Sequence, residues 1–212
     1  MKDIFVASKQ DEKKKINPPA GRKIDESHMN VLSSFCPNPK GVSFQTQKDE
    51  ESIILFLRSH ILTNLSWITI SFVLIVLPVI ILTFLSNFGL DFLSTPAANR
   101  FTAVFVLFYY LLVFSFVFVN FLHWFYNVFI VTSERVVDID YSDVVVHNIA
   151  VTDLSHIEDV NYTQSGFIPT FFHYGNLFVQ TAGNERNFEA FSVPKPREAT
   201  HIIGDLTEKK SK

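Results

Sequence analysis

One stretch of this sequence gathers three side chains that could do chemistry together. His156, Glu158 and Asp159 lie close along the chain, and an imidazole beside two carboxylates is a set that can bind a metal ion or exchange protons. On a strand, however, residues two apart share a face and adjacent residues do not. The three side chains therefore do not converge locally, and we interpret them as parts of a solvated turn.

The other residues that could carry chemistry are scattered. The remaining histidines show no metal-ligand spacing, and they are His28, His60, His123, His147, His173 and His201. Cys36 is the only cysteine, so neither an intrachain disulfide nor a cysteine-based zinc site can form. The sequence has no glycine-rich phosphate loop, no nucleophile elbow and no basic face for nucleic acid. We therefore predict a protein that is not an enzyme, with no catalytic, cofactor-binding or metal-binding residues.

Two long apolar runs predict the largest structural elements of the chain. No Asp, Glu, Lys or Arg occurs from Ile61 to Leu90, or from Phe101 to Phe125. A helix that spans a membrane needs about 20 mostly apolar residues. The runs therefore predict two membrane-spanning helices, at about 63–86 and 101–123, joined by a short turn. A soluble domain of 212 residues would have too little chain left to wrap two such helices.

The distribution of basic residues predicts the orientation of this hairpin. Ten Lys and Arg residues precede the first run and seven follow the second, whereas only Arg100 lies in the connecting turn. Lys48, Arg58 and Arg135 are the ones nearest to the ends of the runs. An excess of basic residues near a span marks its cytoplasmic side. We therefore expect a multi-pass protein of the cell membrane with both termini in the cytoplasm.

The first 48 residues have the composition of a tail. The segment Lys9–Lys15 is highly charged, and Asn17–Gly21 and Cys36–Gly41 are rich in helix breakers. Such a composition buries too little apolar surface to offset its ordering entropy, so we expect 1–48 to be disordered. Residues 49–126 would hold the spans and the segment Ile53–His60 before them. This segment either lies in the membrane interface as a short helix or pairs with the soluble domain as a strand.

After Tyr126 the apolar residues alternate with polar ones, which is typical of strands. In Val136–Tyr141 this alternation places Asp138 and Asp140 together on one wet face. Near the C-terminus the spacing changes to that of a helix with one apolar stripe, formed by Ala199, Ile202, Ile203 and Leu206. Residues 127–212 are therefore predicted to form a mainly-β soluble domain with strands at 128–132, 136–141, 144–152, 160–164, 177–181 and 187–193. The stripe must lie on the sheet, most simply over an open barrel end.

Five ordered blocks within residues 50–207 resemble the membrane-anchored bacterial pleckstrin-homology-like domain family. The blocks are 129–140, 154–160, 164–166, 174–183 and 193–198, and the two spans resemble the usual amino-terminal part of that family. The sequence departs from the family's usual pattern in lacking a Gly at 140–143 and a Pro at 150–152. The resemblance implies a bent antiparallel sheet or barrel capped by a C-terminal helix. It also implies no known catalytic residues.

The resemblance does not imply a ligand. Eukaryotic domains of this fold often bind inositol phosphates through Lys and Arg side chains of the first hairpin loop, but here that loop offers Glu134 beside Arg135. From Asn127 onward there are seven basic and twelve acidic residues, a formal net charge of −5. An acidic domain is repelled by an anionic leaflet. We therefore expect no specific inositol-phosphate ligand.

Two functions of different classes remain. The first is a membrane-anchored, non-enzymatic interaction or scaffold module that presents its domain at the cytoplasmic membrane face. Its partners would be the lipid bilayer, an unknown protein and, in a homo-oligomer, further copies of the chain. The alternative is a membrane subunit of an exporter or channel assembly. Asn120 and His123 are the only polar candidates at membrane depth, and an interfacial position accounts for them without a proton path. The spans also carry no charged or small-residue stripe to line a pore.

Overall fold

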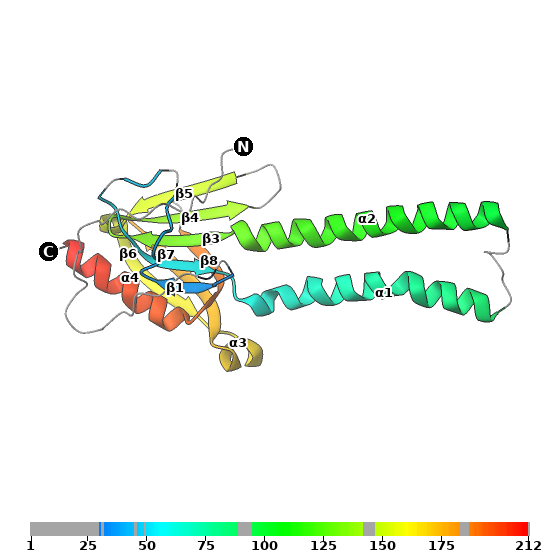
Figure 1. The fold of residues 1–212 in the computed structure, drawn as a ribbon. Coiled ribbons are helices and arrows are strands. Elements are labelled where there is room, and N and C mark those ends of the chain that lie inside the picture. The colour runs from blue at the N-terminus through cyan, green and yellow to red at the C-terminus, as the bar shows by residue number, and fades with distance from the viewer. Residues whose placement is uncertain are drawn as a thin grey trace. The chain divides into compact units, whose positions relative to one another are not determined.

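A computed structural model describes residues 30, 32–44, 46–48, 50–88, 95–141, 147–182 and 187–211. The chain divides into two compact units. The helical unit is Ile61–Trp124, and the β unit combines the chain up to His60 with the chain from Phe125 onward. Figure 1 shows the helices and sheets of both units.

The helical unit consists of a short 3-10 turn and two long helices, η1 (Ile61–Asn64), α1 (Leu65–Asn87) and α2 (Pro96–Tyr126). Both helices are long and apolar enough to cross a membrane, and only 6% of the most apolar stretch of each is buried. A core helix of a soluble protein would have most of that surface covered. The two predicted spans therefore correspond to two helices of the expected length and character.

Two tyrosines of α2 donate hydrogen bonds to α1 in the turn that precedes its proline. Pro78 has no amide hydrogen, so it cannot donate the usual helical hydrogen bond to the carbonyl of Leu74. The hydroxyl of Tyr109 donates to this carbonyl oxygen at 2.8 Å, and the hydroxyl of Tyr110 donates to the carbonyl oxygen of Ile75 at 3.0 Å. The polar groups of these tyrosines are thus used within the hairpin.

The β unit contains two antiparallel sheets (Figure 1). The five-stranded sheet has the order β1 (Phe35–Pro37), β2 (Ile53–Arg58), β3 (Val128–Thr132), β4 (Arg135–Tyr141) and β5 (His147–Asp153). The three-stranded sheet has the order β6 (Ile157–Thr163), β7 (Tyr174–Thr181) and β8 (Phe188–Pro194). A 3-10 turn, η2 (Leu154–His156), joins the sheets, and the helices are α3 (Phe167–Phe171) and α4 (Pro196–Ser211). The predicted β-rich domain with a C-terminal helix is confirmed. The start of the predicted strand 144–152 and the turn between the strands 177–181 and 187–193 lie outside the described residues.

The strand that precedes the helices, β2, pairs with the strand that follows them, β3. β2 pairs with β3 in antiparallel register, with Arg58 opposite Val128 and Leu57 opposite Phe129. Of the two alternatives for Ile53–His60, the strand is therefore correct. A domain boundary at residue 127 leaves this strand out, because β2 belongs to the β unit although the whole helical unit separates it from β3 in sequence.

Part of the segment that we expected to be a disordered tail forms a strand. Phe35–Pro37 forms β1 at the edge of the larger sheet, and Cys36 and Phe44 are 2% and 7% exposed. These side chains cover one face of the sheet, where they pack with a cluster that includes Phe56, Ile130 and Val137. This burial offsets the ordering entropy that made disorder the expectation. Residues 1–29 lie outside the described residues.

The second cluster, which we call the inner cluster, fills the space between the sheets and under α4. It includes Leu55, Leu57 and Phe129 from the larger sheet and Leu177 and Val179 from the smaller one. The predicted helix stripe is confirmed, because Ala199 and Ile203 are fully buried there and Ile202 and Leu206 pack at its margin. α4 lies on β6, β7 and η2.

Candidate functional site

The three residues singled out first do not form a joint site. His156 ends η2, whereas Glu158 and Asp159 are exposed on β6. The carboxylate of Asp159 accepts hydrogen bonds from the Val160 backbone and the Asn161 side chain, at 2.8 and 2.6 Å. Within the described part of the chain, no three His, Cys, Asp or Glu side chains are placed to hold a metal ion.

A connected polar cluster lies where β3 turns into β4. The Glu51 side chain is fully buried, and its two carboxylate oxygens accept hydrogen bonds from Arg135 Nε and Nη2 at 2.9 and 3.0 Å. The backbone amide of Lys48 donates a further hydrogen bond to Glu51. Burial alone would raise the pKa of Glu51, but the hydrogen bonds from Arg135 and Thr132 outweigh it, so the pKa is lowered. The pair is therefore ionised on both sides at neutral pH.

The basic groups around this turn have partners within the chain. Lys48 Nζ lies 2.7 Å from a carboxylate oxygen of Glu134. Lys210, near the end of α4, donates to the Glu134 carbonyl oxygen at 2.7 Å. A head-group phosphate would have to displace these contacts and the Glu51 pair before it could bind the turn.

A shallow open pocket of about 260 Å³ lies beside this cluster. Its lining includes two cations, one carboxylate and one imidazole, within the set Lys48, Arg135, Val151, Thr152, Asp153 and His156. The acids predicted together with this imidazole, Glu158 and Asp159, are not among the lining residues. The pocket therefore brings charged groups of both signs together with an imidazole.

A buried arginine marks the other end of the β unit, where the chain leaves at His60 and returns at Phe125. We call this the junction end. Arg58 is 2% exposed, and its guanidinium lies 4.5 Å from the centre of the Phe125 ring. Burial lowers the pKa of Arg58 to about 10, which keeps it charged at neutral pH. Its sequence position suggested a juxtamembrane charge, but the structure uses it inside the β unit.

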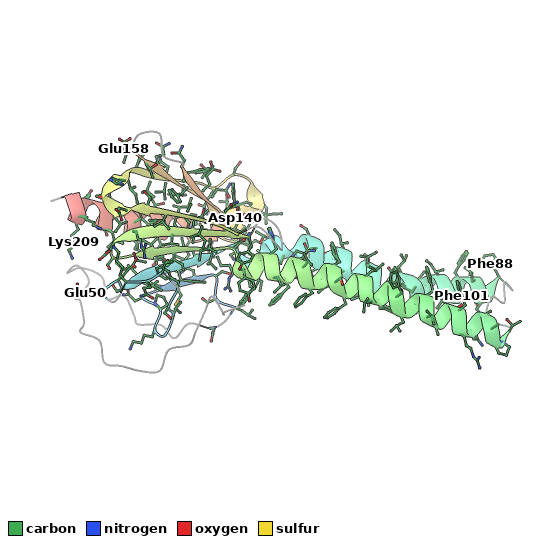
Figure 2. All side chains as sticks on the ribbon, turned by 90° about the horizontal axis from the view of Figure 1, so that it is seen from above. Glu50, Phe88, Phe101, Asp140, Glu158 and Lys209 are labelled. Atoms are coloured by element: carbon green, nitrogen blue, oxygen red, sulfur yellow. The ribbon has the colours of Figure 1, made fainter. Side chains whose placement is uncertain are left out.

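Asp138 is less exposed to solvent than the alternation of apolar and polar residues in β4 predicts. It stands directly opposite Phe129 across the β3–β4 pair, so its side chain is on the sheet face that carries the inner cluster. Burial, together with the nearby Asp140 carboxylate, raises the pKa of Asp138 to about 6. Figure 2 shows Asp140 at one end of the β unit and Glu50 and Lys209 at the other.

One strand edge offers an apolar surface. β5 is an edge strand of its sheet, and its Ile149 and Val151 side chains are 57% and 43% exposed. They stand opposite Ile139 and Val137, on the face that Phe44 and Cys36 cover further along the sheet. Edge strands with exposed apolar side chains are common sites of strand addition and protein contact.

Sequence reasoning missed Glu51 as the partner of Arg135. The two residues are separated by 84 positions, and nothing in the local pattern of either one indicates the other. A scan against protein-family models and searches of curated proteins and solved structures found no match to this chain.

Proposed function

We propose that this protein is a membrane-anchored, non-enzymatic interaction module that presents its β unit at the cytoplasmic face of the cell membrane. The observation that carries the proposal is the insertion of two apolar helices between paired strands β2 and β3. The hairpin is the anchor, and the β unit is the part that meets a partner.

The strand pairing supports a two-pass arrangement. Arg58 and Val128 are opposite one another in a single sheet, so the chain that leaves the β unit must return to the same side of any membrane it crosses. Two helices of sufficient length occupy the interval, which accommodates one crossing in each direction. The excess of basic residues outside the interval favours the cytoplasmic side for both ends.

The β unit supports a pleckstrin-homology-like fold. Four consecutive antiparallel strands, β2 to β5, are followed by three more, β6 to β8, and by the C-terminal helix α4. This order agrees with a bent sheet capped by a helix, and β1 is an added edge strand. The helical hairpin then lies between the first and second strands of that fold.

The charges of the β unit favour a protein partner over a phosphorylated lipid. Arg135, in the first hairpin after the helices, is held by both oxygens of Glu51, and the chain from Asn127 onward is acidic. The apolar edge at Ile149 and Val151 provides the kind of surface that another protein can cover.

Cysteine accessibility in intact cells tests the topology. Cys36 is buried and is first replaced by Ala, and a single cysteine is then placed by Thr95→Cys or by Glu158→Cys, both at exposed positions. An impermeant maleimide should label the Thr95→Cys chain in intact cells and the Glu158→Cys chain only after permeabilisation. Labelling of the Glu158→Cys chain in intact cells would invert the orientation, and protection of both would contradict spanning.

Site-specific photocrosslinking tests the interaction role. A photoreactive residue at Ile149 should crosslink to one defined protein in cells, whereas the same residue at Glu158 should not. The added substitution Val151→Lys, at the same edge, should abolish the crosslink while the chain remains in the membrane fraction. Equal crosslinking from both positions would contradict a partner surface at this edge.

A further inference from the structure

A short helix at the junction end of the β unit carries a group of large apolar side chains that no core covers. In α3 and the residue after it, Phe167 is 84% exposed, Ile168 56%, Phe171 64% and Phe172 45%. None of the α3 residues is buried. A soluble protein seldom leaves four neighbouring large apolar side chains in water without a function for them.

The chain segment that contains this helix carries no charged side chain. No Asp, Glu, Lys or Arg occurs from Val160 to Asn184, a segment that contains the last four residues of β6 and all of α3 and β7. An exposed apolar segment without charged residues of its own suits an apolar or interfacial environment better than an electrostatic partner.

The contacts of β7 and β8 place α3 at the junction end. The His60 ring stacks on the Tyr174 ring with centroids 5.1 Å apart, and the His60 amide donates to the Ser192 carbonyl at 2.7 Å. Tyr174 comes two residues after Phe172, a chain length of at most about 7 Å. The next residue after His60, Ile61, begins the helical unit. The exposed aromatic side chains are therefore close to the point where the chain enters that unit.

A further exposed aromatic side chain lies at the same end, on another strand. Phe191 of β8 is 58% exposed, and its carbonyl oxygen accepts a hydrogen bond at 3.0 Å from the Ser59 hydroxyl. Ser59 directly precedes His60, so this side chain also belongs to the part of the β unit nearest the chain exit.

Hydrogen bonds and close packing tie the segment to the neighbouring strands. The Gln164 side-chain amide donates to the Tyr174 carbonyl at 3.2 Å, and the Lys195 amide donates to the His173 carbonyl at 2.7 Å. At Gly175 an added Cβ would come within 2.5 Å of the Thr163 carbonyl oxygen, which shows how closely the strands on either side of α3 approach. A preorganised apolar surface loses little conformational entropy when it enters a new environment.

We propose that α3 and Phe191 form a wedge that inserts into the interfacial layer of the same bilayer that holds the helices. The inference rests on the proposed membrane anchoring, since it takes the bilayer as the occupant. The wedge gives the β unit a second membrane contact besides the chain connections at His60 and Phe125. Because this contact is apolar, it does not depend on anionic lipid and is insensitive to salt.

Depth-dependent fluorescence quenching tests the wedge in the full chain. The Cys36→Ala protein is reconstituted into phosphatidylcholine vesicles that contain a lipid with a nitroxide at a shallow acyl position. A polarity-sensitive fluorophore is attached after Phe171→Cys, with Phe167→Cys as a second reporter. Glu158→Cys serves as the water-exposed control in the β unit, and Leu107→Cys as the control in α2, where Leu107 is 70% exposed.

We expect blue-shifted emission and strong nitroxide quenching at both wedge positions, unchanged in 0.5 M salt, and neither effect after Glu158→Cys. If the wedge reporters behave like the Glu158→Cys reporter while the Leu107→Cys reporter is quenched, the inference is wrong and the anchoring stands. A lack of quenching after Leu107→Cys would instead overturn the anchoring and the wedge together. A blue shift at the wedge positions without quenching would identify a protein surface as the occupant and overturn the inference.

Discussion

Tyr109 carries a hydroxyl within a mostly apolar run of side chains, and Pro78 accounts for its hydrogen bond. A carbonyl left without a hydrogen bond in hydrocarbon is costly, and Pro78 leaves the Leu74 carbonyl without its usual donor. The Tyr109 hydroxyl supplies a donor from the other helix, at 2.8 Å. The two residues, 31 positions apart in sequence, therefore act as one unit.

A double-mutant cycle tests this coupling. Tyr109→Phe should destabilise the hairpin by about 0.6–2 kcal/mol, the range measured for hydrogen bonds between membrane helices. In a Pro78→Ala chain the amide is restored, so the same substitution should cost much less. Reversible unfolding of the purified chain in mixed micelles measures both costs. Equal costs in the two backgrounds would show that the hydroxyl does not serve the proline gap.

Asp138 makes the stability of the β unit depend on pH. Its pKa is raised to about 6 in the folded chain, above the value of about 3.9 expected in the unfolded chain. The folded state therefore holds this proton more tightly, and the group contributes stability below about pH 4 that is lost as pH rises through 6. Asp138→Asn should thus raise the melting temperature at pH 8 more than at pH 4.5. Glu158→Gln, at an exposed position on the other sheet, is the control and should change it far less.

At the scale of elements, α4 depends on a narrow set of buried contacts. Ile203 is fully buried against the inner cluster, whereas Asp205 on the same helix is exposed. Ile203→Asp should remove about 1.5–3 kcal/mol of apolar burial and add the cost of a buried charge. Limited proteolysis should show rapid loss of the β unit for this substitution and wild-type resistance for Asp205→Asn. Equal resistance of both variants would mean that α4 does not stabilise the unit.

The elements that could be predicted from the sequence are those whose signal is local. The uninterrupted apolar runs indicate the long helices, and the spacing of Ala199, Ile202, Ile203 and Leu206 indicates which face of α4 is buried. The pairing of β2 with β3 is not a local signal, because the strand pattern of Ile53–Arg58 does not specify a partner beyond two helices. The breakers around Cys36 likewise concealed a three-residue strand that is stabilised by its neighbours. In the candidate site, the sequence indicates Arg135 but not its partner Glu51, because the two residues are far apart in the chain.

At the scale of the whole molecule, the β unit should survive without the helices if both of its chain segments are kept. We expect a chain in which a short Gly/Ser linker replaces residues 61–124 to fold, because Arg58 and Val128 are already opposite each other in the sheet. A fragment of residues 127–212 lacks β2, which leaves the Phe129 and Val131 side of the core without its neighbour. Only the linked chain should show near-ultraviolet circular dichroism and a cooperative melt.

A matched substitution strengthens this comparison. Leu55 is fully buried in β2, so Leu55→Asp should abolish the melt of the linked chain, whereas Glu158→Gln on the surface should leave it unchanged. A cooperative melt of the 127–212 fragment at the temperature of the linked chain would show that β2 is dispensable for the core.

The insertion of the helices between β2 and β3 also separates the synthesis of these two paired strands in time. The ribosome must add the 69 residues from Ser59 to Asn127 after β2 before the partner strand begins. At about 5–20 residues per second this takes roughly 3–14 s. During this interval the apolar strand β2 has no partner strand, and an unpaired strand edge is prone to aggregation. In the proposed two-pass arrangement, insertion of both helices returns the chain to its starting side, where β3 can pair with β2, so membrane integration would precede completion of the sheet.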